Sequence, residues 1–191
     1  MQMATVIPYP LELTTDRLMI RFPAVADAQD MREAIAESLD ALKPWMPWAD
    51  HLPTIEEAEA NCARAAQEFK DAKDFRLHLF LRDSDAFVGG SGLHNADWST
   101  PKFEIGYWVR QSCSGNGYIA EAVAEIARFA LEELTAKRVE SRTSARNVRS
   151  WRVAERLGFT LDGVLRNDTR HLDGSLRDTK VYSMVAMRPQ E

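Results

Sequence analysis

The chain has 191 residues, of which 45% are hydrophobic and 28% are charged, as expected for a soluble globular protein with one domain at residues 1–191. Its net charge of −5 argues against a general nucleic-acid-binding protein, and no apolar run approaches the roughly 20 residues that span a membrane. Because the chain has two cysteines and no export-signal pattern at its start, we expect a cytoplasmic protein without a disulfide framework.

Strand and helix patterns follow one another along the whole chain. Residues 43–53 contain too many prolines for regular structure and are predicted to form a loop. Thr54 and Glu57 form a capping box at the start of one helix, and Gly158 ends another. The order β-α-α-β-β-β-α-β-α-β-β predicts a three-layer α+β fold with a mixed central sheet. Strands are expected at 11–22, 75–82, 86–94, 103–109, 138–144, 159–166 and 179–187, and helices from 27, from 54, from 118 and at 147–157.

The stretch from Glu104 to Glu121 is the most informative part of the sequence. An alternating strand runs into a loop of small residues, which opens directly into a helix. Gly115 and Gly117 let the backbone turn tightly, so that bare N–H groups come together at the helix N-terminus. Such a terminus favours an anion, and we predict a phosphate site. An ordinary glycine-containing turn between a strand and a helix is the alternative.

Cysteine and histidine residues suggest little further chemistry. Cys62 lies on the apolar face of a predicted helix and is expected in the core, while Cys113 lies in the phosphate loop without a sequence pattern that would make it a nucleophile. The histidines lack the spacing of metal ligands, so no metal site is predicted. His78 and His94 lie on adjacent predicted strands, where they line a cleft or serve a structural role.

Five segments spread over nearly the whole chain resemble those of a known family. They are TTDRLMIR at 14–21, MPW at 46–48, EIGYW at 104–108, SGNGYIAEAV at 114–123 and NVRSWRVAERLGFTLDGVLR at 147–166. In these segments the chain resembles the GNAT superfamily of N-acetyltransferases, and within it the Rim-type branch, the ribosomal-protein N-terminal alanine and serine acetyltransferases. The resemblance implies acetyl-CoA as cosubstrate and an amine acceptor that is a protein N-terminus or a small molecule. Because the family often dimerises, a homodimer is one option for the oligomeric state.

The same resemblance implies how acetyl-CoA is held. The glycine loop would bind its pyrophosphate, and the strand that carries Tyr107 would separate from the next strand, freeing main-chain groups for the pantetheine arm and for the oxyanion. Ser150 would donate a proton to the departing thiolate, although Asn147 and Ser150 also suit a helix start. The implied contacts are Tyr107, Trp108, Val109, Ser112, Ser114, Gly115, Asn116, Gly117, Tyr118, Asn147, Ser150 and Arg152.

A general base is needed because an amine with a pKa of about 8 (α-amino) or about 10.4 (lysine) is mostly protonated at neutral pH. Where this branch often carries a glutamate after the GVLR-like segment, the chain has Thr169, with Asp168 one residue early. Glu104, on the strand before the loop, is the main candidate. The alternatives to Glu104 are Asp168, a water relay and His94.

The resemblance also places Trp45 and Trp48 at the acceptor pocket, while the tryptophans have the alternative of filling the gap between the two early helices. His94, on a strand expected at the cleft, is a further candidate for contact with the acceptor. The basic residues between 137 and 156, among them Arg142 and Arg156, are expected either at the phosphates of CoA or on a solvated helix face paired with Glu132, Glu133 and Glu155.

Two other functions compete with an acetyltransferase. A domain of this type that binds CoA or a peptide without turnover remains open, because the carboxylate at position 169 is missing. An NAD-dependent oxidoreductase is suggested by Gly115, Gly117 and Ala120, but the acidic residue expected after the next strand is replaced by Thr143 and Ser144.

Overall fold

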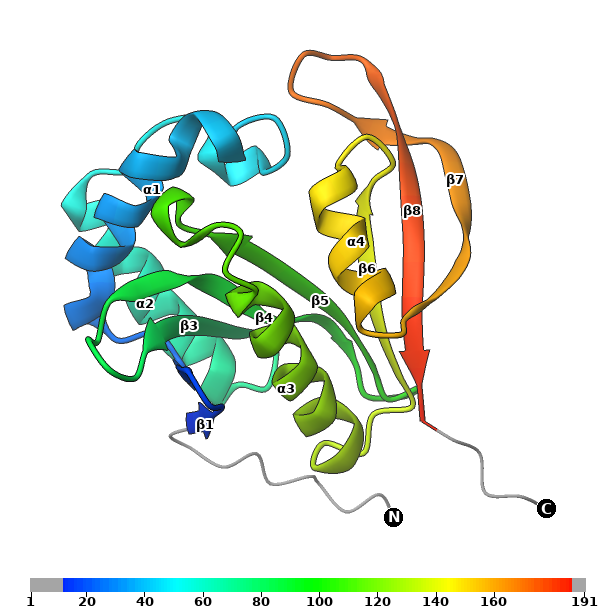
Figure 1. Cartoon of the computed structure of the whole chain (residues 1–191), viewed down its shortest axis with the longest axis horizontal. Helices are drawn as coiled ribbons and strands as arrows, with labels where there is room; N and C mark the ends of the chain where they lie inside the picture. Colours follow the sequence, from blue (N-terminus) through cyan, green and yellow to red (C-terminus); the bar gives the residue numbers. More distant parts are fainter. Residues whose placement is uncertain (1–11, 187–191) are drawn as a thin grey trace.

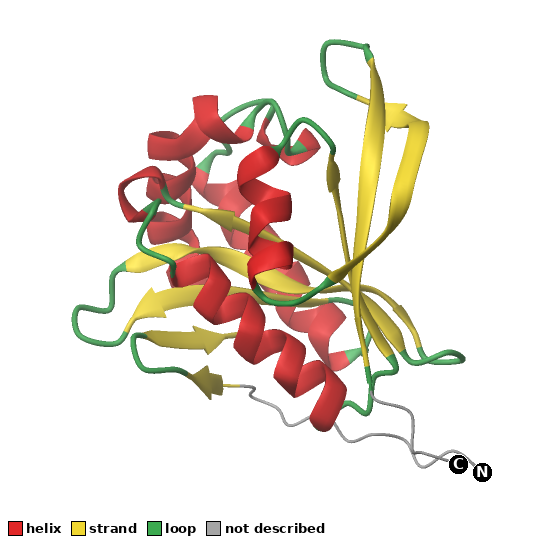
Figure 2. Cartoon of the chain, turned by 45° about the vertical axis from the view of Figure 1, so that its right-hand side comes forward, coloured by secondary structure: helices red, strands yellow, loops and turns green. Residues whose placement is uncertain are grey.

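The computed structural model describes residues 12–186 and shows eight strands in one mixed sheet, ordered β1-β2-β3-β4-β5-β6-β8-β7. Helices α1 and α2 cover one face of the sheet, and α3 and α4 cover the other (Figures 1 and 2). The strands are β1 (Glu12–Thr14), β2 (Leu18–Arg21), β3 (Phe75–Leu81), β4 (Phe87–Asp97), β5 (Lys102–Val109), β6 (Arg138–Ser144), β7 (Thr160–Arg170) and β8 (Leu176–Val185). The helices are α1 (Ala28–Leu42), α2 (Ile55–Lys70), α3 (Tyr118–Glu132) and α4 (Val148–Arg156), with 3-10 turns η1 (Val25–Asp27), η2 (Pro47–Ala49) and η3 (Gln111–Cys113).

The predicted α+β architecture is confirmed, with a correction at the first strand. The single strand expected at 11–22 is a short antiparallel pair, β1 and β2, because Thr15 closes a turn with its N–H donating to Leu18 O at 2.9 Å. The final hairpin is longer than predicted, since β7 and β8 continue to pair through the polar residues Thr169 and Arg177. Residues 1–10, which carry no export-signal pattern, lie outside the described residues, as do Leu11 and Met187 at the ends of two predicted strands.

Each face of the sheet has its own apolar core. On one face α3 buries Val123, Ile126 and Ala130, which recur at helical spacing. On the other face the core between α1, α2 and the sheet includes Cys62, whose side chain is fully buried as predicted. Burial raises the pKa of the Cys62 thiol to about 11, which makes this cysteine a packing residue rather than a nucleophile.

The sheet opens in its middle, between β5 and β6. These parallel strands share only three residue pairs, the last of which joins Glu104 to Glu140. Beyond that point β5 continues along β4 to Val109, whereas β6 continues along β8 to Ser144. The strands therefore diverge and leave a wedge that opens toward the α4 end of the molecule (Figure 1), as the family resemblance implied.

Candidate active site

A cavity of about 830 Å³ lies at the wedge. Small residues form part of its floor on β4 and β5, and Gly90 is one of them because a Cβ there would lie 2.5 Å from the Trp108 indole nitrogen. Eight of the residues predicted for the site line the cavity: Trp45, Trp48, His94, Glu104, Tyr107, Trp108, Asn147 and Ser150.

The glycine loop lies where β5 gives way to α3. Gly115 and Gly117 have φ angles of +85° and +81°, in the left-handed region that favours glycine, and Gly117 caps α3. The amides of Gly115, Asn116 and Gly117 donate to no acceptor within residues 12–186. Free N–H groups at a helix N-terminus bind anions, so the loop fits a pyrophosphate.

Arg17, in the turn between β1 and β2, supports this loop from outside. Its guanidinium donates to Asn116 O at 3.0 Å and to Glu121 Oε2 at 2.7 Å, and lies 4.6 Å from the centre of the Tyr118 ring. Thr15 Oγ1 donates to the other oxygen of Glu121 at 2.5 Å. Burial alone would raise the pKa of Glu121, but the hydrogen bonds from Thr15 and Arg17 lower it.

The C-terminal half of α1 holds the other end of the loop. Glu37 Oε1 accepts the Ser112 N–H at 2.6 Å, and Glu37 Oε2 accepts from Arg110 Nε at 2.5 Å. The pKa of Glu37 is lowered first by the side chain of Ser112, then by that of Arg110, and to a smaller extent by the Ser112 N–H. The Ser112 amide is therefore occupied by a protein carboxylate and is not among the free N–H groups of the loop.

The start of α4 closes the α3 side of the wedge. Asn147 Oδ1 accepts the Ser150 N–H at 3.2 Å, so Asn147 is the helix cap that the sequence suggested. The Tyr107 hydroxyl donates to Ser150 O at 2.9 Å, while Ser150 Oγ lies 3.4 Å from that hydroxyl, a long distance for a hydroxyl pair. Burial raises the pKa of Tyr107 and keeps the phenol neutral.

The Trp108 side chain lies on the face of the sheet opposite to that of Tyr107, since successive side chains of a strand alternate between its faces. Its ring lies 5.7 Å from the ring of Trp48, on the α1 side of the sheet. Trp45 lies 6.4 Å from the His171 ring at the end of the β7–β8 hairpin, so the loop after α1 and the hairpin meet at the edge of the cavity.

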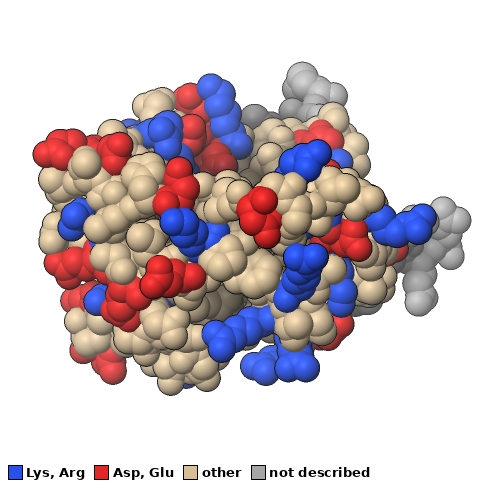
Figure 3. Space-filling view, turned by 90° about the horizontal axis from the view of Figure 1, so that it is seen from above, with Lys and Arg blue, Asp and Glu red and all other residues tan. Residues whose placement is uncertain are grey.

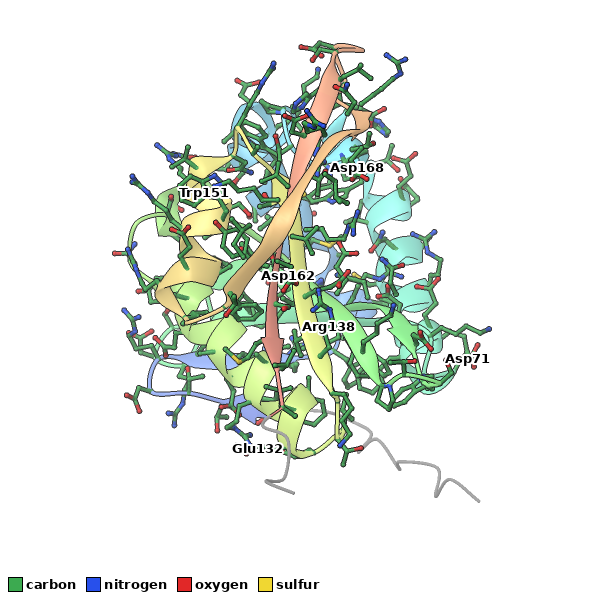
Figure 4. The ribbon with its side chains drawn as sticks, turned by 90° about the vertical axis from the view of Figure 1, so that its right-hand side faces the viewer. Asp71, Glu132, Arg138, Trp151, Asp162 and Asp168 are labelled. Carbon is green, nitrogen blue, oxygen red and sulfur yellow. The ribbon has the colours of Figure 1, made fainter. Side chains whose placement is uncertain are left out.

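Glu104 and Asp168 have different surroundings. Glu104 lines the cavity opposite His94 in the β4–β5 ladder, and its Oε2 accepts from Asn95 Nδ2 at 2.9 Å. Asn95 lies in an irregular stretch of β4 with a φ of +50°, and a bulge of this kind re-aims side chains. Asp168 lies high on β7 (Figure 4) and accepts from Arg142 Nη2 at 3.2 Å, outside the cavity lining. The structure brings Glu104, but not Asp168, to the cavity.

The basic residues between 137 and 156 were given three acidic residues as alternative partners. Two of these acidic residues pair instead with an arginine outside that segment. Glu132 and Glu133 pair with Arg128 on α3, and Glu155 accepts the Tyr182 hydroxyl, so the predicted pairing with the basic segment is wrong. Basic side chains gather along the lower edge of the molecule in Figure 3. Arg152 is exposed on α4, with its guanidinium 5.8 Å from the Trp151 ring and outside the cavity lining.

Residues 12–186 lack two further kinds of feature. No group of three or more His, Cys, Asp and Glu side chains there is arranged to hold a metal ion. No helix of this part of the chain has the length and apolar character needed to cross a membrane.

The chain is similar to known proteins in sequence and in fold. The protein-family model described as "Acetyltransferase (GNAT) domain" matches residues 17–160. The ribosomal protein uS5-alanine N-acetyltransferase of Escherichia coli (strain K12) is 28% identical over 170 residues, which cover 88% of this chain and 87% of that protein. Among solved structures, the microcin C7 self-immunity acetyltransferase MccE with acetyl-CoA and AMP has a TM-score of 0.83 at 22% identity, covering 90% of this chain and 94% of that one. RimL, a ribosomal L7/L12 alpha-N-protein acetyltransferase, in complex with coenzyme A, has a TM-score of 0.83 at 16% identity, covering 90% and 95%.

Proposed function

The chain belongs to the GNAT family of acetyltransferases, and from that premise we propose that it acetylates the α-amine of a protein or peptide N-terminus with acetyl-CoA. The observation that carries the proposal is the single cavity in which Tyr107 and Ser150 meet Glu104 and the tryptophans. The name of the Escherichia coli relative gives a ribosomal protein's alanine as its acceptor, which supports a protein N-terminus here. Such an acceptor agrees with the cytoplasmic location expected from the sequence.

On the donor side, the chain supplies binding groups and one acid. The free amides from Gly115 to Gly117 would bind the pyrophosphate, and the edge of β5 beyond Glu104 would pair with the pantetheine arm. Acetyl-CoA supplies the activated thioester. A main-chain N–H of β5 would donate to the thioester oxygen as the amine attacks. Ser150 Oγ, only loosely held by Tyr107, would protonate the departing sulfur.

On the acceptor side, Glu104 would take the proton of the ammonium group. It lines the cavity with one oxygen held by Asn95, whereas Asp168 is held by Arg142 away from the lining. His94 remains an alternative, but its Nδ1 is already within 2.8 Å of Asp74 Oδ2. Deprotonating an α-amine at pH 7 costs about 1 kcal/mol, against about 4 to 5 kcal/mol for lysine, so an N-terminal amine demands less of the base.

Free-thiol release from acetyl-CoA tests the function. We expect turnover with peptides that have a free N-terminal alanine or serine, and none with N-terminally blocked peptides that carry lysine. Polyamines and free amino acids complete the panel. CoA binding without turnover of any acceptor would support a binding module instead, and binding of NAD(H) without CoA would support the oxidoreductase.

Arg17 provides a test of the donor side. Replacing Arg17 by alanine is expected to raise the KM for acetyl-CoA about tenfold, equivalent to about 1.4 kcal/mol, with little change in kcat. The loop would lose the guanidinium that joins Asn116, Glu121 and Tyr118, and its amides would be less preorganised. Initial rates at saturating acceptor measure the effect. Arg128→Ala, at the far end of α3, is the matched control, and an equal KM in the two variants would contradict the prediction.

A further inference from the structure

Strand β8 places at the cavity an arginine, Arg177, that has no acidic partner within the described residues. Arg177 lines the cavity, and its Nε is buried without a hydrogen-bond partner. No carboxylate oxygen within residues 12–186 lies in ion-pair distance of its guanidinium. A partly buried guanidinium normally has a partner, because removing its charge from water is costly.

The neighbouring arginine is different. Arg142 also lines the cavity, but its guanidinium lies 3.2 Å from Asp168 and 3.9 Å from Glu140. Asp168 is thus already bound by Arg142, which leaves Arg177 as the guanidinium of this pair without a direct partner.

The β7–β8 hairpin concentrates other unpartnered polar atoms. Of the five buried side-chain N and O atoms without a partner in the described chain, four belong to it: His171 Nε2, Ser175 Oγ, Arg177 Nε and Thr179 Oγ1. Arg177 and Thr179 are two residues apart on β8 and so share one face of the strand. The hairpin's end meets Trp45 at the edge of the cavity. Of these four residues, Arg177 is the one whose side chain lines the cavity.

The charges around Arg177 indicate what it binds. The pKa of Arg177 is lowered, first by burial. Among the neighbouring charges, those of Asp168 and Glu104 raise this pKa and that of Arg142 lowers it. Glu104 therefore acts electrostatically on Arg177, and both residues line one cavity. An acceptor with a cationic amine and a nearby anion would satisfy the two protein charges at once.

We infer that Arg177 binds a carboxylate of the acceptor, so that the enzyme prefers amines with an acidic group close by. The inference rests on the proposed function, with the amine facing Glu104. A carboxylate suits the planar fork of donors that a guanidinium presents. It comes either from an acidic side chain next to a peptide's N-terminal residue or from the free carboxylate of an amino acid.

Two amidated peptides that differ only in Asp or Asn at the second position test the inference, with free alanine and free aspartate as the other arms. For the wild-type protein we expect a KM about tenfold lower for the Asp peptide. Arg177→Gln should remove this preference by raising the KM of the Asp peptide alone, with kcat within about twofold. Arg177→Lys should retain part of the preference. Arg166→Gln, exposed on β7, is the matched control and should behave as wild type.

Direct binding separates failure of the inference from failure of the proposed function. Calorimetric titration of both peptides into CoA-loaded protein should show tighter binding of the Asp peptide, and Arg177→Gln should abolish the difference. Equal binding and equal KM for the two peptides would overturn the inference even if both are acetylated. If neither is acetylated, the proposed function fails, while the binding difference still decides whether Arg177 recognises a carboxylate. A free amino acid bound as tightly as the Asp peptide would identify its own carboxylate as the group recognised.

Discussion

Replacing Glu104 by glutamine is expected to lower kcat/KM for an N-terminal acceptor by about two to three orders of magnitude at pH 7. The carboxylate would no longer accept the proton of the ammonium group, whereas the amide oxygen of glutamine can still accept the hydrogen bond from Asn95. The fold and the cavity should therefore remain. Initial rates of thiol release, with melting temperature as the check on folding, measure the effect.

The pH profile tells a missing base from a misplaced substrate. The fraction of free α-amine rises from about a tenth at pH 7 to most of it at pH 9, because its pKa is about 8. The deficit of Glu104→Gln should shrink over this range, since the acceptor then arrives already deprotonated. A deficit that is the same at both pH values would point to a positioning role.

Asp168→Asn is the comparison variant for the same chemistry. We expect a few-fold effect, from the loss of the contact with Arg142, because Asp168 lies outside the cavity lining. The opposite ranking of the two variants would assign the base to Asp168.

The second large effect is on stability. Replacing Asp27 by asparagine is expected to lower the free energy of unfolding by about 3 to 5 kcal/mol, as for a broken buried ion pair. Asp27 is only 4% exposed and accepts two hydrogen bonds from Arg21, at 2.8 and 2.6 Å. Its Oδ2 also lies 2.9 Å from both Ala24 N and His78 Nδ1. Asparagine removes the charge that Arg21 requires.

Chemical denaturation at pH 7 measures this loss, with Asp71→Asn as the control. Asp71 is the C-terminal cap of α2 (Figure 4), and its carboxylate contacts Lys73 at the surface, so we expect its replacement to change the free energy of unfolding little. Similar free energies for the two variants would show that the Asp27 network contributes little.

The same network predicts how stability depends on pH. Burial would raise the pKa of Asp27, but hydrogen bonds from His78 and Arg21 outweigh it and hold the folded-state pKa far below the ordinary value. This contribution is therefore present above about pH 4 and is lost as the pH falls below it. Burial lowers the pKa of His78, so unfolding favours proton uptake and stability also falls below about pH 6.5. In Asp27→Asn the acid part of this dependence should flatten.

Local patterns predicted the parts of the site that one segment builds. The shape of the glycine loop could be predicted because glycines, strand and helix are contiguous, and the positive φ angles of Gly115 and Gly117 confirm the reason for those glycines. The cap at Asn147 was readable for the same reason.

Contacts between segments that are distant in the sequence could not be predicted. Arg17 stands 104 residues before Glu121, and although the segment 14–21 carried the family resemblance, nothing in its spacing indicated a contact with the loop. The length of β7 and β8 was underestimated because their outer halves pair through polar residues, which lack an apolar alternation. Arg177 was not predicted as a site residue, because a lone arginine in a strand carries no motif.

The opening between β5 and β6 also divides the molecule mechanically. Strands β1 to β5 form one half of the sheet and β6, β8 and β7 the other, and three residue pairs are all that join their ladders. Across the remaining seam the Tyr107 hydroxyl reaches Ser150 O as a cross-link between the halves. A ligand bound along this seam would act as an inserted strand. Its binding free energy would therefore add to the free energy needed to separate the two halves of the sheet. Ligand binding would then slow amide exchange along β5 and β6. During turnover the seam would become more stable when the ligand binds and less stable when the product leaves.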